Sequence, residues 1–307
     1  MRIVSFLPAG TEIIHMLGAG DELVGRSHEC DFPAGVVDLP VVSRPALQIK
    51  AASPEEIDRA VSERMESGAS MYAIDEVLLR DLRPDVIVTQ NLCRVCAPSG
   101  NELSRAVRDF DVTPEILFLS PHNMLEIEEN IASVGRAIGR EREAASLIES
   151  NRSRVAAVSE RVAAEATRRV VFLEWTDPLF CAGHWVPEMI ELAGGHDPLG
   201  RPGADSVRMT WAEVADADPE VIVVSPCGFG LGESAQLARS LPRVGAARIV
   251  AVDANAYYAR PGPRAAEAVE LLGHLFHPRL VEWPHAHRPW FIGNVFGVDR
   301  VFAKYTA

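Results

Sequence analysis

The stretch REREAASLIESNRSRVAAVSERVAAEA (residues 140–166) decides the fold, because it predicts one long helix between two regions of a different pattern. It contains no proline and is dominated by alanine, glutamate, arginine, serine and valine. At about 1.5 Å per residue such a helix spans about 40 Å, roughly the length of a small domain. The preceding stretch MLEIEENIASVGRAIG (124–139) predicts another helix. We therefore expect a helical linker over residues 123–168.

On both sides of this linker, short apolar runs alternate with helical stretches. Such alternation predicts mainly parallel sheets with right-handed crossovers. The sequence thus predicts an α/β protein: an N-terminal lobe (1–122) and a C-terminal lobe (169–307), both Rossmann-like, joined by a single backbone helix. The expected strands are 2–7, 22–28, 85–90, 115–120, 169–175, 220–226 and 246–254. The expected helices outside the linker are 10–20, 54–67, 74–84, 101–110, 186–195, 211–219 and 262–278.

Composition restricts the classes of function. The formal charge of −13 disfavours a nucleic-acid partner, because an acidic surface repels phosphate. No apolar run reaches the roughly 18 residues that a membrane-spanning helix needs. The sequence begins with a predicted strand and shows no signal-peptide pattern, which predicts a cytoplasmic protein unless a leader has been trimmed, in which case it is periplasmic or surface-anchored. The 5 cysteines fit free thiols in a reducing compartment better than a disulfide framework.

Thiol, imidazole and aromatic side chains follow several of the predicted strands directly. In open α/β sheets, ligands bind beyond the carboxyl ends of the strands, so we expect these side chains to converge on one site. They are His28, Cys30, Cys93, Cys96, Cys181, His184, Cys227, Tyr257, Tyr258 and Arg260.

The pair Cys93 and Cys96 leaves three interpretations open. A zinc knuckle needs a second pair of ligands. Together with Cys30 and Cys181 these thiols are candidates to hold iron, zinc or a cluster. A redox pair usually opens a helix after a strand, which the helix expected from about Asn101 allows. In the third interpretation the thiols are small apolar residues that line a pocket.

Histidines and tryptophans are the main candidates for ligand contact. A neutral imidazole of His28 or His184 suits cobalt, iron or zinc, and the alternative for His28 is a hydrogen bond to its own loop. Trp175 and Trp185 offer flat faces for a corrin or porphyrin ring. The alternative is that one indole lies in the core and the other packs under the loop.

Four further residues complete the predicted ligand contacts. Tyr72 and Phe229 are aromatic candidates, and the glycines beside Phe229 allow close backbone approach to a ligand. Tyr258 and Arg260 suit the amides or carboxylates of a ligand. The alternatives are an ordinary turn around Phe229 and a surface ion pair for Arg260.

Several stretches in order resemble one family across nearly the whole chain. The resemblance is to the substrate-binding proteins of vitamin B12, haem and iron-siderophore ABC transporters, of the class with a helical backbone. Within that class, SHEC (27–30), TQNLCRVC (89–96) and AGHW (182–185) resemble a cobalamin-binding subgroup. The stretches that carry the family resemblance are RIVSFLPAGTEIIHMLGAGDELVGRSHECDFP (2–33), LRPDVIVTQ (82–90), ELAGG (191–195) and AYYARPGPRAAEAVELLGHLFHP (256–278).

The resemblance implies two α/β lobes joined by one long helix, with the ligand held in a cleft between them. It implies cobalamin or a related corrinoid as the ligand. It also implies an ABC permease partner that contacts one acidic residue on each lobe, which would be Glu76 and Glu191 here.

Two other classes of function stay open at this point. One is a protein that binds iron, zinc, a cluster or a haem-type ligand through its cysteines and histidines. The other is a cysteine-dependent enzyme on the same scaffold. The sequence has no G-x-S-x-G elbow, phosphate loop or H-E-x-x-H motif, so we expect a binding protein rather than an enzyme.

Overall fold

The computed structural model describes residues 1–46, 53–67, 71–91, 103, 106–108 and 110–282. The chain divides into two compact units, each with its own sheet, so the prediction of two α/β lobes is confirmed. The N-terminal unit comprises Met1–Pro121 and Leu125–Glu149. The C-terminal unit comprises His122–Met124 and Ser150–Ala307.

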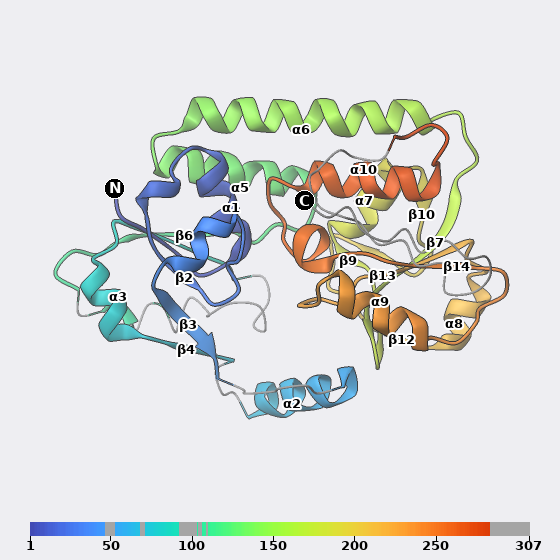
Figure 1. Cartoon of the computed structure of the whole chain (residues 1–307), viewed down its shortest axis with the longest axis horizontal. Coiled ribbons are helices and arrows are strands. Elements are labelled where there is room, and N and C mark those ends of the chain that lie inside the picture. Colours follow the sequence, from blue (N-terminus) through green and yellow to red (C-terminus); the bar gives the residue numbers. More distant parts are fainter. Residues whose placement is uncertain (47–52, 68–70, 92–102, 104–105, 109, 283–307) are drawn as a thin grey trace. The chain divides into compact units, whose positions relative to one another are not determined.

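The N-terminal unit is built on a six-stranded, mainly parallel sheet (Figure 1). In chain order its strands are β1 (Ile3–Ser5), β2 (Leu23–Ser27), β3 (Val41–Pro45), β4 (Tyr72–Ile74), β5 (Val86–Thr89) and β6 (Glu115–Phe118). They lie in the order β4-β3-β2-β1-β5-β6, and only the β3–β4 pair is antiparallel. β1 and β5 are buried throughout, as expected for central strands that are covered on both faces.

Local signals in the sequence explain where the helices of this unit begin and end. Ser53 accepts a hydrogen bond from the Glu56 backbone and Glu56 returns one, a capping box that starts α2 with Pro54 in its first turn. α3 ends at Arg83, which has left-handed backbone and precedes Pro84. The helices and 3₁₀ turns are α1 (Pro8–Met16), η1 (Gly20–Glu22), η2 (Ala34–Asp38), α2 (Pro54–Glu66) and α3 (Glu76–Leu82).

Two consecutive helices follow β6, as the sequence predicts. They are α5 (Met124–Ala137) and α6 (Glu141–Val162), and the boundary between the two units falls within α6. A Cβ atom on Gly135 would lie 2.6 Å from the Ala144 Cβ, so glycine permits close packing of the two helices. α6 ends at Val162, short of the predicted 166, because the chain turns there with the Glu165 N–H bonded to the Val162 carbonyl at 2.9 Å.

The C-terminal unit is built on a second sheet, with a separate two-stranded ribbon. Its strands are β7 (Arg168–Thr176), β8 (Leu179–Cys181), β9 (Gly183–His184), β10 (Gly195–His196), β11 (Arg201–Pro202), β12 (Arg208–Met209), β13 (Val221–Val224) and β14 (Arg248–Ala251). The sheet order is β12-β8-β7-β13-β14, with β10 also paired to β7, and β11 pairs with β9 in the ribbon. β7, β13 and β14 are mutually parallel, so their carboxyl ends share one edge of the sheet.

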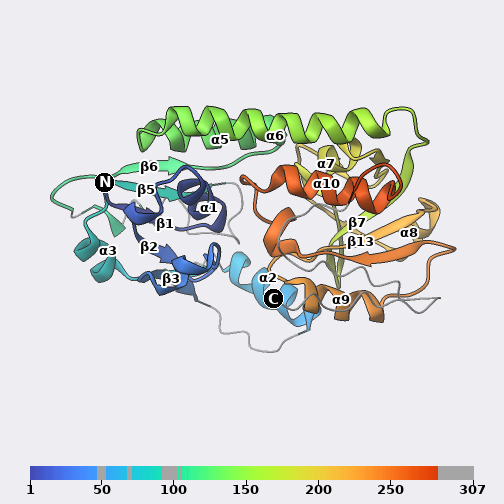
Figure 2. The ribbon, with the colours of Figure 1, turned by 45° about the horizontal axis from the view of Figure 1, so that its top comes forward.

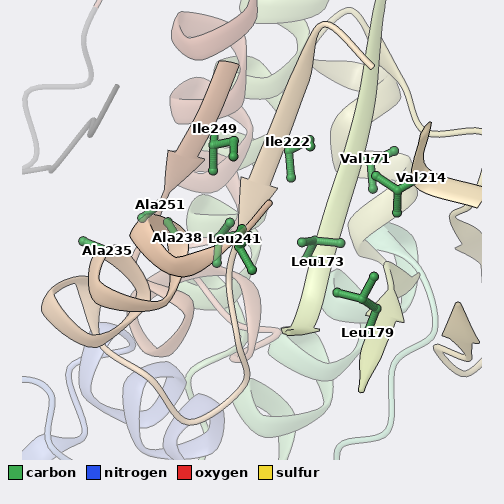
Figure 3. Close-up of a cluster of buried hydrophobic side chains, with 11 residues drawn as sticks. Val171, Leu173, Leu179, Val214, Ile222, Ala235, Ala238, Leu241, Ile249 and Ala251 are labelled. Atoms are coloured by element: carbon green, nitrogen blue, oxygen red, sulfur yellow. The ribbon is translucent and has the colours of Figure 1, made fainter. Parts of the chain in front are cut away.

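Helices cover both faces of this second sheet (Figure 1, Figure 2). α7 and α10 lie together on one face, and α8 and α9 lie on the other. Figure 3 shows Val171, Ile222 and Ile249 from three neighbouring strands in a buried cluster that includes residues of α8 and α9. The helices are α7 (Val186–Leu192), α8 (Trp211–Asp216), α9 (Leu231–Ser240), the π-helix η3 (Ala254–Tyr258) and α10 (Ala265–Phe276).

The structure adds elements that the sequence pattern does not predict. α9 is the longest of them. Its buried residues are Ser234, Ala235 and Ala238, and these small side chains do not produce the helical repeat of large apolar residues from which a helix is predicted. β3, β4 and the short strands β8 to β12 were also not expected. Most of the helix predicted at 101–110 lies outside the described residues. In the part of the chain that is described, no helix combines the length and apolar character needed to cross a bilayer.

Candidate functional site

Two aromatic rings stack at the carboxyl edge of the C-terminal sheet. Trp175 lies near the end of β7, and Phe229 lies in the loop that follows β13. Their ring centroids are 5.4 Å apart with an interplanar angle of 29°, and both side chains keep part of their surface exposed. This geometry leaves a flat apolar surface where ligands of open α/β sheets bind.

The loop that carries Phe229 is held by Asn255, a residue that the sequence analysis did not single out. The Asn255 side-chain amide donates to the Gly228 carbonyl at 3.0 Å, and its backbone N–H donates to the Phe229 carbonyl at 3.3 Å. Gly228 has a φ of 86°, which favours glycine at this turn. The position of the Phe229 ring is therefore fixed by contacts to the segment after β14.

His184 is the second candidate ligand contact in this unit. Its φ of 51° is uncommon for a residue with a side chain. The imidazole contacts two other rings, with centroid distances of 5.9 Å to His122 and 5.6 Å to Trp185. His184 Nε2 is 3.0 Å from Asp205 Oδ1. Neither His122 nor Asp205 was predicted, and nothing in the local sequence signals their approach to His184.

Glu174 connects the loop of Phe229 with the loop of His184. Its carboxylate Oε1 accepts the Gly183 N–H at 2.8 Å, and its carbonyl accepts the Cys227 N–H at 3.2 Å. One residue of β7 thus ties down both loops. A planar ligand could stack on the aromatic surface while a nitrogen lone pair is offered by the imidazole of His184.

Asp197 supports the His184 loop from the interior. Its carboxylate accepts hydrogen bonds from the backbone N–H groups of Phe172 at 3.0 Å, Leu199 at 3.0 Å and Gly200 at 3.2 Å. Burial raises the pKa of Asp197 to about 6, against the lowering effect of these three donors. The segment it anchors leads into β11, which pairs with the strand containing His184.

Three predicted contact residues of this unit are buried. The Trp185 side chain donates from Nε1 to the Tyr258 carbonyl at 3.0 Å and is only 7% exposed. The Tyr258 hydroxyl donates to the Ala268 carbonyl at 3.2 Å, and burial raises the pKa of this tyrosine well above its usual value. Arg260 is also buried. Within the C-terminal unit, the buried Trp185 ring lies 5.6 Å from the His184 ring, and the Tyr258 backbone anchors it.

The predicted cysteine site divides between described and undescribed residues. Cys93 and Cys96 lie outside the described residues. Cys181 is buried, its sulfur accepts the Val207 N–H at 3.4 Å, and burial raises the pKa of its thiol, which disfavours the thiolate that metals bind. Cys227 is exposed. No three or more histidine, cysteine, aspartate or glutamate residues are grouped so as to hold a metal ion in the described ranges.

In the N-terminal unit, two of the predicted contact residues, His28 and Tyr72, lie close together. Their ring centroids are 5.8 Å apart at an interplanar angle of 46°. His28 Nδ1 lies 3.1 Å from the Ser43 carbonyl and Nε2 lies 3.0 Å from a Glu29 carboxylate oxygen. Both ring nitrogens thus face acceptors, so a lone pair on His28 becomes available only if one of these contacts is broken.

Cys30, two residues after His28, is fully buried. The Thr11 hydroxyl donates to its sulfur at 3.0 Å, and the Ser27 hydroxyl lies 3.5 Å from it. A ligand would have to displace these neighbours to reach the thiol. The predicted permease contacts, Glu76 on α3 and Glu191 on α7, both have exposed side chains.

Comparisons with known proteins identify relatives of the whole architecture. The model of the periplasmic binding protein family matches residues 3–259. No curated protein matches the sequence. Among solved structures, the periplasmic heme-binding protein RhuT from Roseiflexus sp. RS-1 aligns with a TM-score of 0.66 and 21% identity, over 90% of this chain and 98% of that one.

Two further solved structures come from Vibrio cholerae. The periplasmic vitamin B12 binding protein BtuF aligns with a TM-score of 0.62 and 21% identity, over 90% of this chain and 96% of that one. The periplasmic heme-binding protein HutB aligns with a TM-score of 0.64 and 20% identity, over 91% of this chain and 99% of that one. At such low identity these likenesses establish a common fold.

Proposed function

The chain belongs to the periplasmic binding protein family, and we propose that it binds a flat, metal-centred ring, with cobalamin or a related corrinoid as the leading candidate. The observation that carries this proposal is the stacked, partly exposed pair of Trp175 and Phe229 beside the loop of His184. The resemblance of three short stretches to a cobalamin-binding subgroup supports the same choice.

The chemistry of the C-terminal unit suits such a ligand in two ways. Large aromatic faces gain free energy by covering the apolar faces of a ring system, and Trp175 presents the larger face of the pair. An imidazole nitrogen suits cobalt or iron as a ligand, and Glu174 holds the loop of His184 together with the loop of Phe229. A corrinoid or a porphyrin supplies the other metal ligands itself, so the protein needs to add only one.

Haem is the second candidate ligand. Solved structures with the same fold include heme-binding proteins, RhuT and HutB among them, beside the vitamin B12 binding protein BtuF. The aromatic surface and the single imidazole suit a porphyrin as well as a corrin. The two ligands must therefore be compared directly.

The family match supports a proposal about location and partner. We propose a periplasmic protein that delivers its ligand to an ABC permease. Glu76 and Glu191 are exposed, which a direct contact with a permease requires. A binding role also agrees with the expectation that the chain is not an enzyme.

The test is a titration of the full chain with hydroxocobalamin and with haemin, followed by visible absorbance and by co-elution on gel filtration. We expect one of them to shift its visible bands and to co-elute. Trp175→Ala should weaken that binding about 10-fold, because an aromatic contact contributes on the order of 1 kcal/mol beyond burial.

Phe118→Ala is the matched control, because it removes an exposed aromatic ring from β6 in the other unit. Its affinity should equal that of the unmodified chain. The proposal is wrong if neither compound binds, or if Trp175→Ala binds as tightly as Phe118→Ala.

A further inference from the structure

Asp205 contacts the one predicted ligand residue whose imidazole retains an unoccupied nitrogen. Its Oδ1 lies 3.0 Å from His184 Nε2. A carboxylate only accepts hydrogen bonds, so Nε2 must carry the proton in this contact. In the described part of the chain, His184 Nδ1 makes no hydrogen bond. The contact therefore determines which nitrogen of His184 holds the free lone pair.

The backbone around His184 is held too firmly for this contact to be accidental. The His184 N–H donates to the Ala204 carbonyl at 2.8 Å, and its carbonyl accepts the Gly203 N–H at 2.9 Å. His184 also keeps its left-handed φ of 51°, which costs on the order of 1 kcal/mol for a residue with a side chain. Neighbouring structure thus imposes an unusual conformation on this histidine.

Gly183 brings the backbone of Asp205 close to the His184 strand. A Cβ atom on Gly183 would lie 2.6 Å from the Ser206 nitrogen and 2.8 Å from the Ala204 oxygen. These are backbone atoms that cannot move aside as a flexible side chain would. Only glycine permits the approach, so the Asp205 backbone is placed beside His184 although its side chain is 87% exposed.

The neighbouring rings restrict the plane of the imidazole. The imidazole contacts the rings of both His122 and Trp185, and Trp185 is itself anchored by its hydrogen bond to the Tyr258 carbonyl. The His184 side chain is 16% exposed to solvent. A ring that contacts two other rings and is bonded at Nε2 has one nitrogen left for an outside partner.

We propose that Asp205 is a positioning residue, which accepts the Nε2–H of His184 and so makes Nδ1 the atom that this unit offers to its ligand. The ligand class is a metal centre that takes one further nitrogen donor. This assignment rests on the proposed function only for the identity of the ligand. The tautomer of His184 follows from the Asp205 contact alone. Partners of this kind commonly change metal affinity 10- to 100-fold when they are removed.

The first test needs no ligand. Long-range ¹H–¹⁵N spectra of the full chain, recorded above the usual titration range of histidine, report which nitrogen is protonated, and His184→Gln assigns the signals. We expect His184 with a protonated Nε2 and an unprotonated Nδ1. In Asp205→Ala the two nitrogen signals should move toward each other as the tautomers mix. Asp205→Asn should retain the original pattern, because its amide oxygen still accepts from Nε2.

Asp216→Ala is the control, because it removes an exposed carboxylate of the same unit from α8. It should leave the His184 signals unchanged. Thermal unfolding of all variants should coincide with that of the unmodified chain, since the Asp205 side chain is exposed. Unchanged signals in Asp205→Ala would overturn the inference whatever the chain binds.

The second test uses haemin and hydroxocobalamin as probes. One of these probes should bind to the unmodified chain. Asp205→Ala should have an affinity for that probe about 10-fold lower than the unmodified chain, and Asp205→Asn should restore most of that loss. Equal affinity in the unmodified chain and Asp205→Ala would overturn the assignment of Nδ1 as the contact atom. If the unmodified chain binds neither probe, the ligand class and the proposed function fail together, while the spectra still decide the role of Asp205.

Discussion

His28 in the N-terminal unit and His184 in the C-terminal unit both follow predicted strands, yet their ring nitrogens are used differently. His28 faces an acceptor at each nitrogen, the Ser43 carbonyl and the Glu29 carboxylate. Among the residues that the structure describes, His184 faces one acceptor, Asp205, at Nε2. The number of acceptors around an imidazole, rather than its position after a strand, thus decides whether it can offer a lone pair.

The groups that hold the two loops also differ in kind. In the N-terminal unit, the Arg26 guanidinium holds the segment around His28, because it donates to the carbonyls of Ser27 at 3.0 Å and Cys30 at 3.1 Å. In the C-terminal unit, the carboxylates of Glu174 and Asp197 hold the segments around His184. Burial raises the pKa of Asp197 to about 6, so its support of the His184 segment depends on pH.

The largest predicted effect is the difference in ligand affinity between variants of the two histidines. His184→Ala removes the nitrogen that we assign to the ligand, so we expect its affinity for the bound probe to fall by more than the 10- to 100-fold typical of a supporting residue. His28→Ala should have a smaller effect, because its nitrogens already face Ser43 and Glu29. Absorbance titrations with haemin and hydroxocobalamin measure both. A larger loss in His28→Ala would reverse the comparison and move the ligand contact to the N-terminal unit.

The next effect concerns pH and the carboxylate of Asp197. Its pKa is raised to about 6 in the folded chain, so the folded state binds the proton more tightly than the unfolded state. Its contribution to stability is fully present below the ordinary value near 4 and is lost as pH rises to about 6. A shift of about 2 units corresponds to roughly 3 kcal/mol. We expect Asp197→Asn to remove this dependence.

The measurement is denaturant unfolding of both chains at about pH 4 and about pH 7, the two sides of the window. The free energy of unfolding of Asp197→Asn, relative to that of the unmodified chain, should rise by about 2–3 kcal/mol from the lower pH to the higher pH. Thr11→Val, which removes the α1 hydroxyl bonded to Cys30 in the N-terminal unit, is the control. Its cost should be the same at both values. A constant difference for Asp197→Asn would show that the carboxyl is not perturbed by burial.

Much of the fold could be predicted because it depends on local pattern. The apolar runs of β5 and β13 and the proline-free stretch of α6 are visible in a window of a few residues. α9 could not be predicted in this way, because its core contact is made by Ala235 and Ala238. The short strands β8 to β12 depend on pairing with distant strands rather than on their own composition.

The candidate site was less predictable because its key contacts join distant positions. Trp175, His184 and Phe229 follow predicted strands, and this placement could be anticipated. The Asn255–Gly228 bond spans 27 positions and the His184–Asp205 contact spans 21, and neither leaves a trace in the local sequence. The spacing of residues along the sequence does not predict burial either. Cys30 and Cys181 both follow predicted strands, but their thiols are buried.

The smallest effect should come from the two capping boxes, one in each unit. Ser53 caps α2, a helix without a buried residue, whereas Thr210 caps α8, whose Val214 is fully buried in the core cluster. Thr210→Ala should therefore lower the free energy of global unfolding by about 1 kcal/mol. Ser53→Ala should only increase fraying of α2, because α2 adds little to the core.

Denaturant unfolding measures the global effect, and amide hydrogen exchange across α2 measures the local one. Thr210→Ser and Ser53→Thr retain a hydroxyl at the cap and should behave like the unmodified chain. Equal losses of global stability from Thr210→Ala and Ser53→Ala would mean that α2 contributes to the cooperative core as α8 does. Different losses would show that the same capping motif stabilises the fold only where its helix carries a buried side chain.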